Sequence, residues 1–510
     1  MNALMNYPML LAQARGSSSD ISAQLNAFLD LAFTPAGFAL GVLGGATLVV
    51  LLFSRGGTQL VAAGALFLLS MMRTESKWAD NTLVQPLETI RSFSRPLAFA
   101  LLVIIAVRSL AFPRGERTRL LVLPAVLFLA YELYYVTLVG AFIDPTRGAF
   151  GLLCYFAALA AFVFGLPKVM QGPGESRGLL GIFAITGLLF ISANFFQLAL
   201  GYSNAVIQGR LTGISGNPQQ FALSCCIFLL VGCYFFSISR AGSWVKWLAA
   251  ISMGILGLFV LWSGSRTGAL CSAVIVVAFF RTKLGRLAVL GLVGGGAFAV
   301  AVSLFGESLE IVERFLEGGD TRSEVWAVAL ADFASSPVFG ILPFVSDDNL
   351  NFTESTYLRT LALMGSIGGI LLLAVMWNWC QTALAVWRLG RNVPSIEAEA
   401  DFVVASTAFF VVANIGEGLM MGVLTIFIPL IYATFAVAAY VLDVGPVQAA
   451  LEAESTEFGD DEEFEAASET ANGSRNTLGP GDASQTRNTD PTVGGRELPP
   501  GGAQPGQALA

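Results

Sequence analysis

Long runs of apolar residues, separated by short polar segments, dominate the chain between residues 31 and 442. Nine runs are long enough for a helix to cross a hydrocarbon core about 30 Å thick, and four others are shorter or less regular. This pattern predicts an all-α, polytopic membrane protein with about 12–13 transmembrane helices. The long runs lie near residues 33–53, 120–143, 149–170, 178–200, 219–237, 244–262, 286–305, 357–377 and 422–442, and the shorter ones near 58–72, 97–112, 266–281 and 402–417.

Polar segments divide the chain into five parts. Residues 1–30 form a polar N-terminal segment without the pattern of a signal peptide. Transmembrane helices fill residues 31–305, and the last three follow in 357–442 after an acidic loop at 306–356. Residues 443–510 are rich in acidic residues, Gly, Pro and Ser, which predicts a disordered acidic cytoplasmic tail.

The interior loop at 306–356 has a helical pattern of its own. Apolar residues recur at helical spacing in Glu307–Leu316 and in Arg322–Phe333, which predicts two short helices. Ser336, Pro337 and Gly340 then interrupt the pattern. A structured loop of this length usually covers a functional site.

The distribution of basic residues predicts which loops face the cytoplasm. Clusters of Lys and Arg occur in every second loop, and such loops are cytoplasmic in most membrane proteins. The intervening loops, with the single arginines Arg147, Arg210 and Arg266 and the long loop 306–356, should face outward. Residues 73–96 do not fit this alternation, so the topology before residue 97 stays open. The clusters contain Arg114, Arg117, Arg119, Lys168, Arg177, Arg240, Lys246, Arg281, Lys283, Arg286, Arg388 and Arg391.

Composition supports the membrane assignment and excludes several kinds of chemistry. Hydrophobic residues make up 55% of the 510 positions and charged residues 13%, about half the usual charged fraction. Histidine is absent, which excludes His-ligated haem, zinc sites with a His ligand and mechanisms with a histidine base. The net charge of −8 comes from the tail, because residues 443–510 alone carry −10. All six cysteines lie in apolar runs, which favours buried thiols over disulfides or metal ligands.

Two outward arginines stand in similar surroundings. Arg210 lies in Gln208–Gly213, shortly before Ser215–Pro218, and Arg266 lies in the turn Trp262–Gly268. Gly and Ser around each arginine allow backbone N–H groups to converge on an anion. A guanidinium is a planar, permanently charged partner for phosphate or diphosphate. Ordinary snorkelling of each arginine to the membrane interface is the alternative.

Carboxylates are the remaining candidates for a general base. Glu354 closes the external loop where the next span begins, and it could accept a proton from a hydroxyl nucleophile. Asp347 and Asp348 compete for this role, and a purely solvated loop acid is the alternative. Glu132 stands in the middle of the 120–143 run, where it could pair with a tyrosine or an arginine or contact a substrate.

Taken in order, several segments resemble the superfamily of O-antigen ligases and Wzy-type polysaccharide polymerases. The resemblance covers roughly Ser203–Leu442, and the Ser-Gly-Ser-Arg turn at 263–266 is its most telling part. The amino-terminal third is similar only in hydropathy. The segments that carry the resemblance are Arg210–Ala222, Trp262–Gly268, Arg322–Trp326, Pro337–Gly340 and Glu354–Gly369.

The resemblance implies a GT-C-like, inverting, metal-independent glycosyltransferase without a cofactor, facing the periplasm from the bacterial inner membrane. Arg210 and Arg266 would bind the diphosphate of an undecaprenyl-linked glycan and stabilise its charge as it leaves. Arg322 would be a third cationic contact and Tyr357 a substrate contact. Glu354 stands where ligases carry the histidine of a His-Asn-x-Tyr-Leu motif, and it would act as the base.

The missing histidine favours a polymerase that joins lipid-linked repeat units over a ligase that transfers glycan to a lipid or protein acceptor. The resemblance implies lipid-linked donor and acceptor glycans, membrane lipids and a chain-length regulator, flippase and export proteins as partners, without nucleic acid. A polysaccharide or lipid transporter is the alternative of another class. Transporters place ionisable residues near the bilayer midplane, whereas most informative charges here lie at the outer face.

Overall fold

The computed structural model describes residue 83 and residues 87–111, 123–143, 145–160, 173–200, 205–207, 209–281, 323–342, 355–420 and 425–473. The chain divides into two compact units, Met1–Glu452 and Ala453–Ala510. The predicted segment 1–30, the predicted spans near 33–53, 58–72 and 286–305, and the predicted helix Glu307–Leu316 lie outside the described residues.

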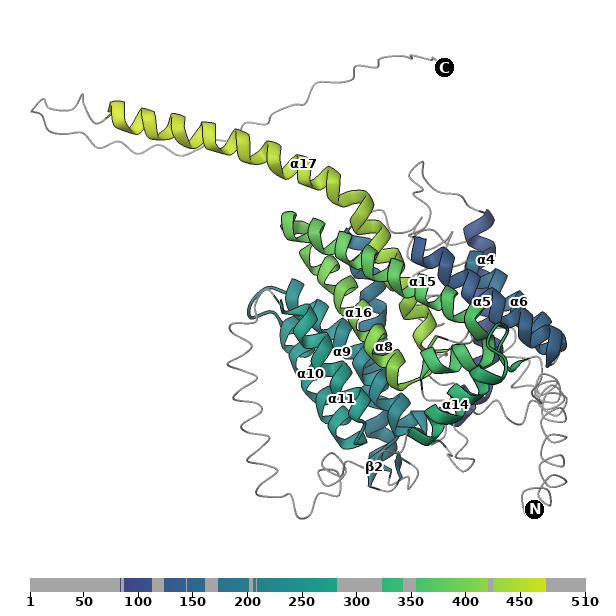
Figure 1. Ribbon diagram of the computed structural model, residues 1–510. Helices are drawn as coiled ribbons and strands as arrows, with labels where there is room; N and C mark the ends of the chain where they lie inside the picture. Colours follow the sequence, from purple (N-terminus) through teal and green to yellow (C-terminus); the bar gives the residue numbers. More distant parts are fainter. Residues whose placement is uncertain are drawn as a thin grey trace, which may run out of the picture. The chain divides into compact units, whose positions relative to one another are not determined.

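The described residues are almost all helical. One short antiparallel hairpin interrupts the helices, with β1 (Val206–Ile207) paired to β2 (Arg210–Leu211). The helices are α4 (Leu87–Ala111), α5 (Leu123–Phe142), α6 (Pro145–Ala158), α8 (Pro173–Ala199), η3 (Gly213–Ser215), α9 (Pro218–Ile238), α10 (Trp244–Ser263), α11 (Arg266–Phe279), α14 (Ser323–Ser335), α15 (Thr356–Asn392), η8 (Pro394–Ile396), α16 (Glu397–Gly416) and α17 (Phe427–Gly473), as Figure 1 shows.

Six described helices are long and apolar enough to cross a membrane: α5, α8, α9, α10, α15 and the first part of α17. Each overlaps a span that the sequence predicts, so the prediction of a helical membrane protein is confirmed. The shorter predicted runs near 97–112, 266–281 and 402–417 fall within α4, α11 and α16. The total of 12–13 spans stays a prediction.

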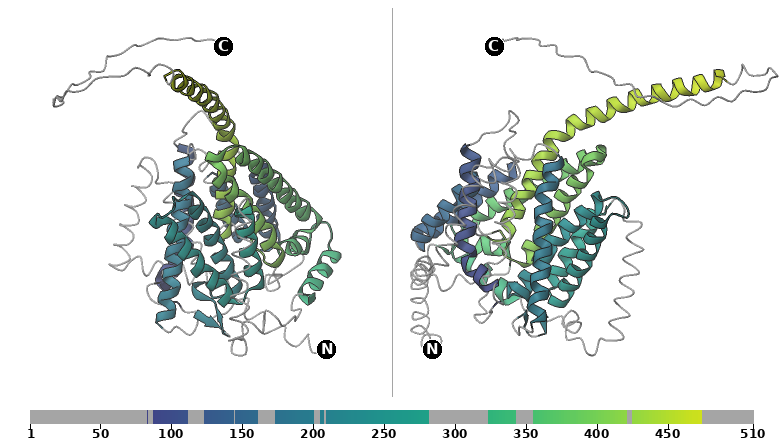
Figure 2. Two further views of the ribbon diagram at one scale, coloured as in Figure 1. Left: turned by 90° about the vertical axis from the view of Figure 1, so that its left-hand side faces the viewer. Right: turned by 180° about the vertical axis from the view of Figure 1, so that it is seen from behind.

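Helix α9 lies at the centre of its neighbours. Its sequence is apolar all round, and 72% of its most apolar window is buried, compared with 22% for α10. A helix without a polar face must be covered by other helices, whereas α10 exposes Trp247, Ile251 and Leu258 on a face suited to lipid. Helices α8, α10, α11 and α16 all contact α9. In both views of Figure 2 the teal helices α8 to α11 run side by side.

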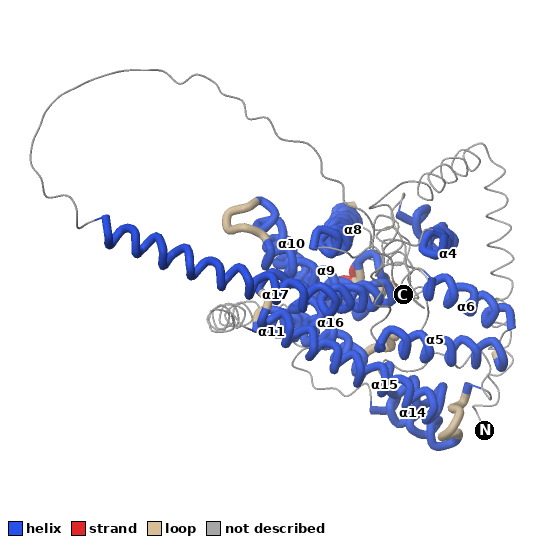
Figure 3. The backbone as a smooth tube through the Cα atoms, turned by 90° about the horizontal axis from the view of Figure 1, so that it is seen from above, coloured by secondary structure: helices blue, strands red, loops and turns tan. Residues whose placement is uncertain are grey.

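The first unit has two distinct sides when it is seen from above. Helices α4 and α6 lie on one side and α10 and α11 on the other, as Figure 3 shows. Helix α5 contacts both α6 and α15, and α15 in turn contacts α16. Helices α15 and α16 therefore connect the side with α4 and α6 to the side with α10 and α11.

Several helix termini lie at one end of the bundle. Short turns join α9 to α10 and α10 to α11, so these three helices alternate in direction. Helix α16 runs antiparallel to α11, because Arg281 after α11 forms an ion pair with Asp401 near the start of α16, with an N–O distance of 2.7 Å. The N-termini of α9 and α11 and the C-termini of α10 and α16 thus share one end. We call it the arginine end, because it carries Arg210 and Arg266.

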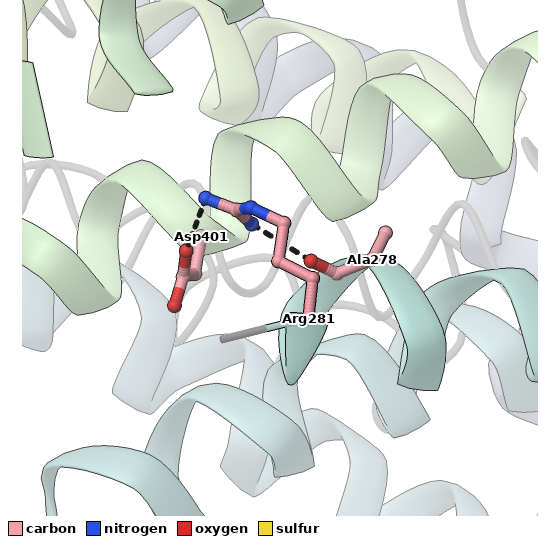
Figure 4. A network of polar contacts seen from close by, with 3 residues as sticks. All are labelled: Ala278, Arg281 and Asp401. Atoms are coloured by element: carbon pink, nitrogen blue, oxygen red, sulfur yellow. Dashed lines mark hydrogen bonds and ion pairs between the residues drawn. The ribbon is translucent and has the colours of Figure 1, made fainter. Parts of the chain in front are cut away.

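At the opposite end of the bundle, buried acidic residues of α16 join neighbouring helices. Glu399 is 2% exposed, and its carboxylate accepts hydrogen bonds from Tyr234 (2.8 Å) and Ser176 (3.2 Å). In Figure 4, Arg281 lies between Asp401 and the carbonyl of Ala278, to which its Nη1 donates at 2.7 Å. These contacts connect the ends of α8, α9 and α11 to the start of α16.

Basic residues predicted to lie on one side of the membrane do gather at this opposite end. They flank the N-terminus of α8, the α9–α10 turn and the C-termini of α11 and α15. The structure therefore places them away from Arg210 and Arg266, as the alternation of loops requires. The described members of this set are Arg177, Arg240, Lys246, Arg281, Arg388 and Arg391.

A break divides α15 near its N-terminus. Gly365 has φ 63° and ψ −159°, far from helical values. The segment after α14 fills the break, because Ser366 donates its backbone N–H to Pro337 (2.8 Å) and Ile341 donates to Ala362 (2.8 Å). The loop that the sequence predicts to be external thus sends Pro337–Leu342 against a transmembrane helix, and Leu342 is fully buried.

Several predicted boundaries differ from the structure. Helix α14 agrees with the prediction for 322–333, but α15 continues to Asn392 rather than residue 377. Helix α17 continues to Gly473, so the first part of the segment predicted to be disordered is helical. Residues 447–457 explain this difference, because they are rich in Ala and Glu, which favour helices.

Candidate functional site

Arg210 is held in the short hairpin that precedes α9. It pairs with Ile207 across β1 and β2, and Gly209 supplies the positive φ of 73° that the tight turn needs. Its neighbour Leu211 is fully buried and anchors the hairpin, whereas Arg210 itself is half-buried. The hairpin therefore fixes the backbone of an arginine whose side chain stays accessible.

A hydrogen bond joins the two arginine turns that the sequence singles out. Arg210 donates its Nε–H to the carbonyl of Ser263, at 2.7 Å, in the turn that leads to Arg266. Gly264 has φ 60°, and a Cβ atom there would approach Arg210 Nε to 3.4 Å. Glycine at this position permits both the left-handed backbone and the close approach of the guanidinium.

Arg266 begins helix α11 and is exposed. The preceding Ser265 caps the helix, because its side chain accepts a hydrogen bond from Gly268 N at 3.1 Å. Ser263 Oγ accepts from Ser265 N (3.2 Å) and donates to Val260 (2.6 Å), which closes the turn. The positive end of the helix dipole and the guanidinium coincide here, so the turn favours a bound anion.

Polar contacts fix the rest of the hairpin against α8 and α9. The buried Asn194 of α8 accepts a hydrogen bond from Ile214 N at 2.8 Å. Gly213 has φ 51°, and a Cβ atom there would clash with Asn194. Asn217 caps α9 by accepting from Gln219 N at 2.8 Å. The position of Arg210 thus depends on three helices at once.

Tyr357 lies at the arginine end, in the first turn of α15. Its hydroxyl donates to the carbonyl of Val411 on α16 at 3.2 Å, and its side chain is half-buried. The hydroxyl therefore contributes to the contact between two helices. Glu354 and Arg322, the two other predicted site residues, lie outside the described residues, each one position before a described segment.

The arginine end also carries a carboxylate that sequence reasoning missed. Glu417 caps the C-terminus of α16 and is 8% exposed. Its backbone carbonyl accepts hydrogen bonds from Thr356 N (3.2 Å) and Thr356 Oγ1 (3.0 Å) at the start of α15. A charged residue inside the apolar stretch 402–442 was the signal that could have found it.

Glu132 lies near the middle of α5 and is 2% exposed. The hydroxyls of Tyr155 on α6 and Tyr432 on α17 lie within electrostatic range of its carboxylate. Its neighbour Tyr131 forms a hydrogen bond with Thr360 on α15 at 2.8 Å. Glu132 is thus buried near tyrosines inside the bundle, and its pairing with a tyrosine or an arginine and its contact with a substrate all stay predictions.

All six cysteines lie within the described residues and are free thiols, five of them buried, as the sequence predicts. Cys226 Sγ donates to the carbonyl of Gly268 at 3.3 Å and packs α9 against the first turn of α11. Within the described part of the chain, no group of three or more Cys, Asp or Glu side chains could hold a metal ion.

The geometry brings together Arg210, Arg266 and Tyr357 at one end of an apolar helical bundle. The two arginine turns touch directly, and the contact between the first turn of α15 and the C-terminal part of α16 lies at the same end. Comparison of the sequence with protein-family models and with curated proteins finds no match in either set.

Proposed function

We propose that this membrane protein is a glycosyltransferase similar to the O-antigen ligase and Wzy-type polymerases, and that it joins undecaprenyl-diphosphate-linked repeat units. The observation that carries the proposal is the hydrogen bond from Arg210 Nε to Ser263, at 2.7 Å. It holds Arg210 against the turn that leads to Arg266, and binding of a single diphosphate by both arginines requires such neighbouring turns. The arginine end then faces the periplasm of a bacterial inner membrane, and the basic opposite end faces the cytoplasm.

In the proposed reaction, a sugar hydroxyl on one lipid-linked repeat unit attacks the anomeric carbon of the growing chain. The bond from that carbon to undecaprenyl diphosphate breaks, and the diphosphate leaves with the electron pair. Arg210 and Arg266 stabilise the charge that develops on the diphosphate, which needs no metal when the cations are preorganised. Arg322 is a third candidate contact, and Glu354 is the base that the sequence favours.

The lipid-linked glycans of cells that lack the protein test this proposal. We expect single repeat units on undecaprenyl diphosphate to accumulate, because their polymerisation is blocked. Complementation with Arg210→Ala or Arg266→Ala should leave the same intermediates, since loss of one such contact lowers rates by about 10²–10³. Arg240→Ala, an exposed arginine at the opposite end, is the matched control and should restore polymer.

Accumulation of full-length lipid-linked polymer would identify a ligase instead. An unchanged glycan profile in cells without the protein would contradict both activities.

Transport of a lipid-linked glycan is the second candidate, and two observations favour it. Helix α15 is broken at Gly365, and Glu132 lies buried near the middle of α5. Broken helices and midplane carboxylates are common in transporters. A transporter would move fluorescent lipid-linked glycan across vesicle membranes without changing its length, whereas the proposed enzyme lengthens the glycan and releases undecaprenyl diphosphate.

A further inference from the structure

Glu417 is a buried carboxylate that the proposed mechanism does not yet use. It follows the last residue of α16 with an extended backbone (φ −144°, ψ 150°) and is 8% exposed. It lies at the arginine end, because α16 runs antiparallel to α11. The sequence around it, from Phe402 to Leu442, is otherwise almost entirely apolar. A carboxylate in such surroundings is costly and calls for a functional or structural reason.

Hydrogen bonds from a second helix fix the backbone of Glu417. Its carbonyl accepts from both the N–H and the hydroxyl of Thr356, at 3.2 and 3.0 Å. The same hydroxyl contacts the side chain of Asn414 and accepts from Leu419 N at 3.0 Å. These contacts connect the residues on both sides of Glu417 to the first turn of α15. The backbone that carries the Glu417 side chain is therefore held in a fixed position.

Glu417 also ends a helix that packs against the helix beginning at Arg266. Helices α11 and α16 are in contact, and the carboxylate lies within electrostatic range of Cys271 on α11. Cys271 follows Arg266 by five positions, which corresponds to about 7.5 Å along the helix axis. Glu417 and Arg266 thus stand at the same end of two neighbouring antiparallel helices.

We propose that Glu417 is the general base of the glycosyl transfer, in the role that the sequence assigns to Glu354. This inference rests on the proposed function. The attacking hydroxyl oxygen forms the new bond to the anomeric carbon, and its proton passes to the Glu417 carboxylate. The bond from that carbon to the diphosphate breaks, and its electron pair stays on the diphosphate oxygen near Arg266. A preorganised carboxylate is the type of group that such a proton transfer needs when histidine is absent.

Single substitutions in the full-length protein, reconstituted in lipid vesicles with purified undecaprenyl-diphosphate-linked repeat units, test the assignment. We expect Glu417→Gln to lower kcat by about 10²-fold or more and to leave KM for the lipid-linked donor nearly unchanged. Glu417→Asp should recover part of the lost rate. Glu399→Gln is the matched control, because Glu399 is a buried carboxylate of the same helix at the opposite end, and it should keep most of the activity.

Wild-type kcat in Glu417→Gln, or equal losses in Glu417→Gln and Glu399→Gln, would overturn the assignment. A large loss in Glu354→Gln with none in Glu417→Gln would return the role of base to Glu354. Arg210→Ala and Arg266→Ala separate this inference from the proposed function. If these variants lose activity while Glu417→Gln does not, only the inference fails. If neither arginine matters, the proposed function fails.

Discussion

In the proposed mechanism, Arg210 has both a structural and a chemical role. Its Nε–H donates to Ser263, which fixes the plane of the guanidinium relative to the turn before Arg266. A guanidinium held in this way offers its donors in a defined plane, and this geometry matches the oxygens of a phosphate. Lysine carries the same charge but has neither the Nε–H at this position nor the planar fork.

We therefore expect Arg210→Lys to lower the polymerisation rate by about 10-fold or more, although the charge is kept. The rate can be measured by the loss of lipid-linked repeat units with time. Arg240→Lys, the same change at an exposed position of the α9–α10 turn, is the control and should have no effect. Full activity in Arg210→Lys would mean that charge alone suffices and that the hydrogen bond to Ser263 has no catalytic role.

At the scale of elements, the break in α15 is the feature that organises the loop after α14. Gly365 adopts a left-handed backbone, and a Cβ atom there would clash with the backbone of Val338. A Cβ atom at Gly340 would likewise clash with the backbone of Leu363. Two glycines thus let an irregular segment lie against a transmembrane helix while backbone hydrogen bonds satisfy the polar groups.

Gly365→Ala should lower the free energy of unfolding by about 2 kcal/mol or more, because alanine combines a strained φ with this clash. Thermal unfolding in detergent measures the effect as a lower midpoint. Gly254→Ala on α10 is the control, since no atom lies within 4 Å of an added Cβ there and alanine favours helices. Equal midpoints for the two variants would contradict the described break in α15.

The sequence predicted the positions of the helices better than the contacts between distant segments. Apolar runs located α5, α8, α9 and α10 within a few residues, because membrane helices need long apolar segments. The break at Gly365 could not be predicted, since Leu361, Ile367 and their neighbours have ordinary helical hydropathy. The break depends on a segment more than twenty positions earlier in the chain.

The candidate site shows the same limit. Gly and Ser around Arg210 and Arg266 identified both turns from sequence alone, but their hydrogen-bonded contact required the fold. Glu417 was missed although it is the one charged residue in 402–442, and its place at the same end as Arg266 follows from the antiparallel pairing of α11 and α16, which no local pattern indicates. The candidate residues in the loop before α15, including Glu354, lie outside the described residues, so their roles stay predictions.

At the scale of the first unit, the two ends of the bundle differ chemically. The arginine end carries Arg210, Arg266 and Glu417 next to Gly- and Ser-rich turns. The opposite end carries the basic loops and an ion-paired, hydrogen-bonded set of acids on α16. This asymmetry is typical of a protein with one fixed orientation in the membrane.

Cysteine labelling can test the orientation. Ser335→Cys at the C-terminus of α14 and Ala241→Cys in the α9–α10 turn introduce exposed thiols at positions predicted to face opposite sides. We expect a membrane-impermeant maleimide to label Ser335→Cys in intact cells with a permeabilised outer membrane, and Ala241→Cys only after lysis. Five of the native cysteines are buried, so the wild-type protein gives the background. The reverse labelling pattern would contradict the proposed orientation.

The central claim is that two touching arginine turns bind one diphosphate during glycosyl transfer. The most direct test is polymerisation by purified protein in lipid vesicles, supplied with undecaprenyl-diphosphate-linked repeat units and a metal chelator. We predict that the wild-type protein produces lipid-linked polymer and undecaprenyl diphosphate, and that Arg210→Ala and Arg266→Ala each lower the rate by about 10²–10³. Polymer formation at the wild-type rate by both variants would contradict the claim.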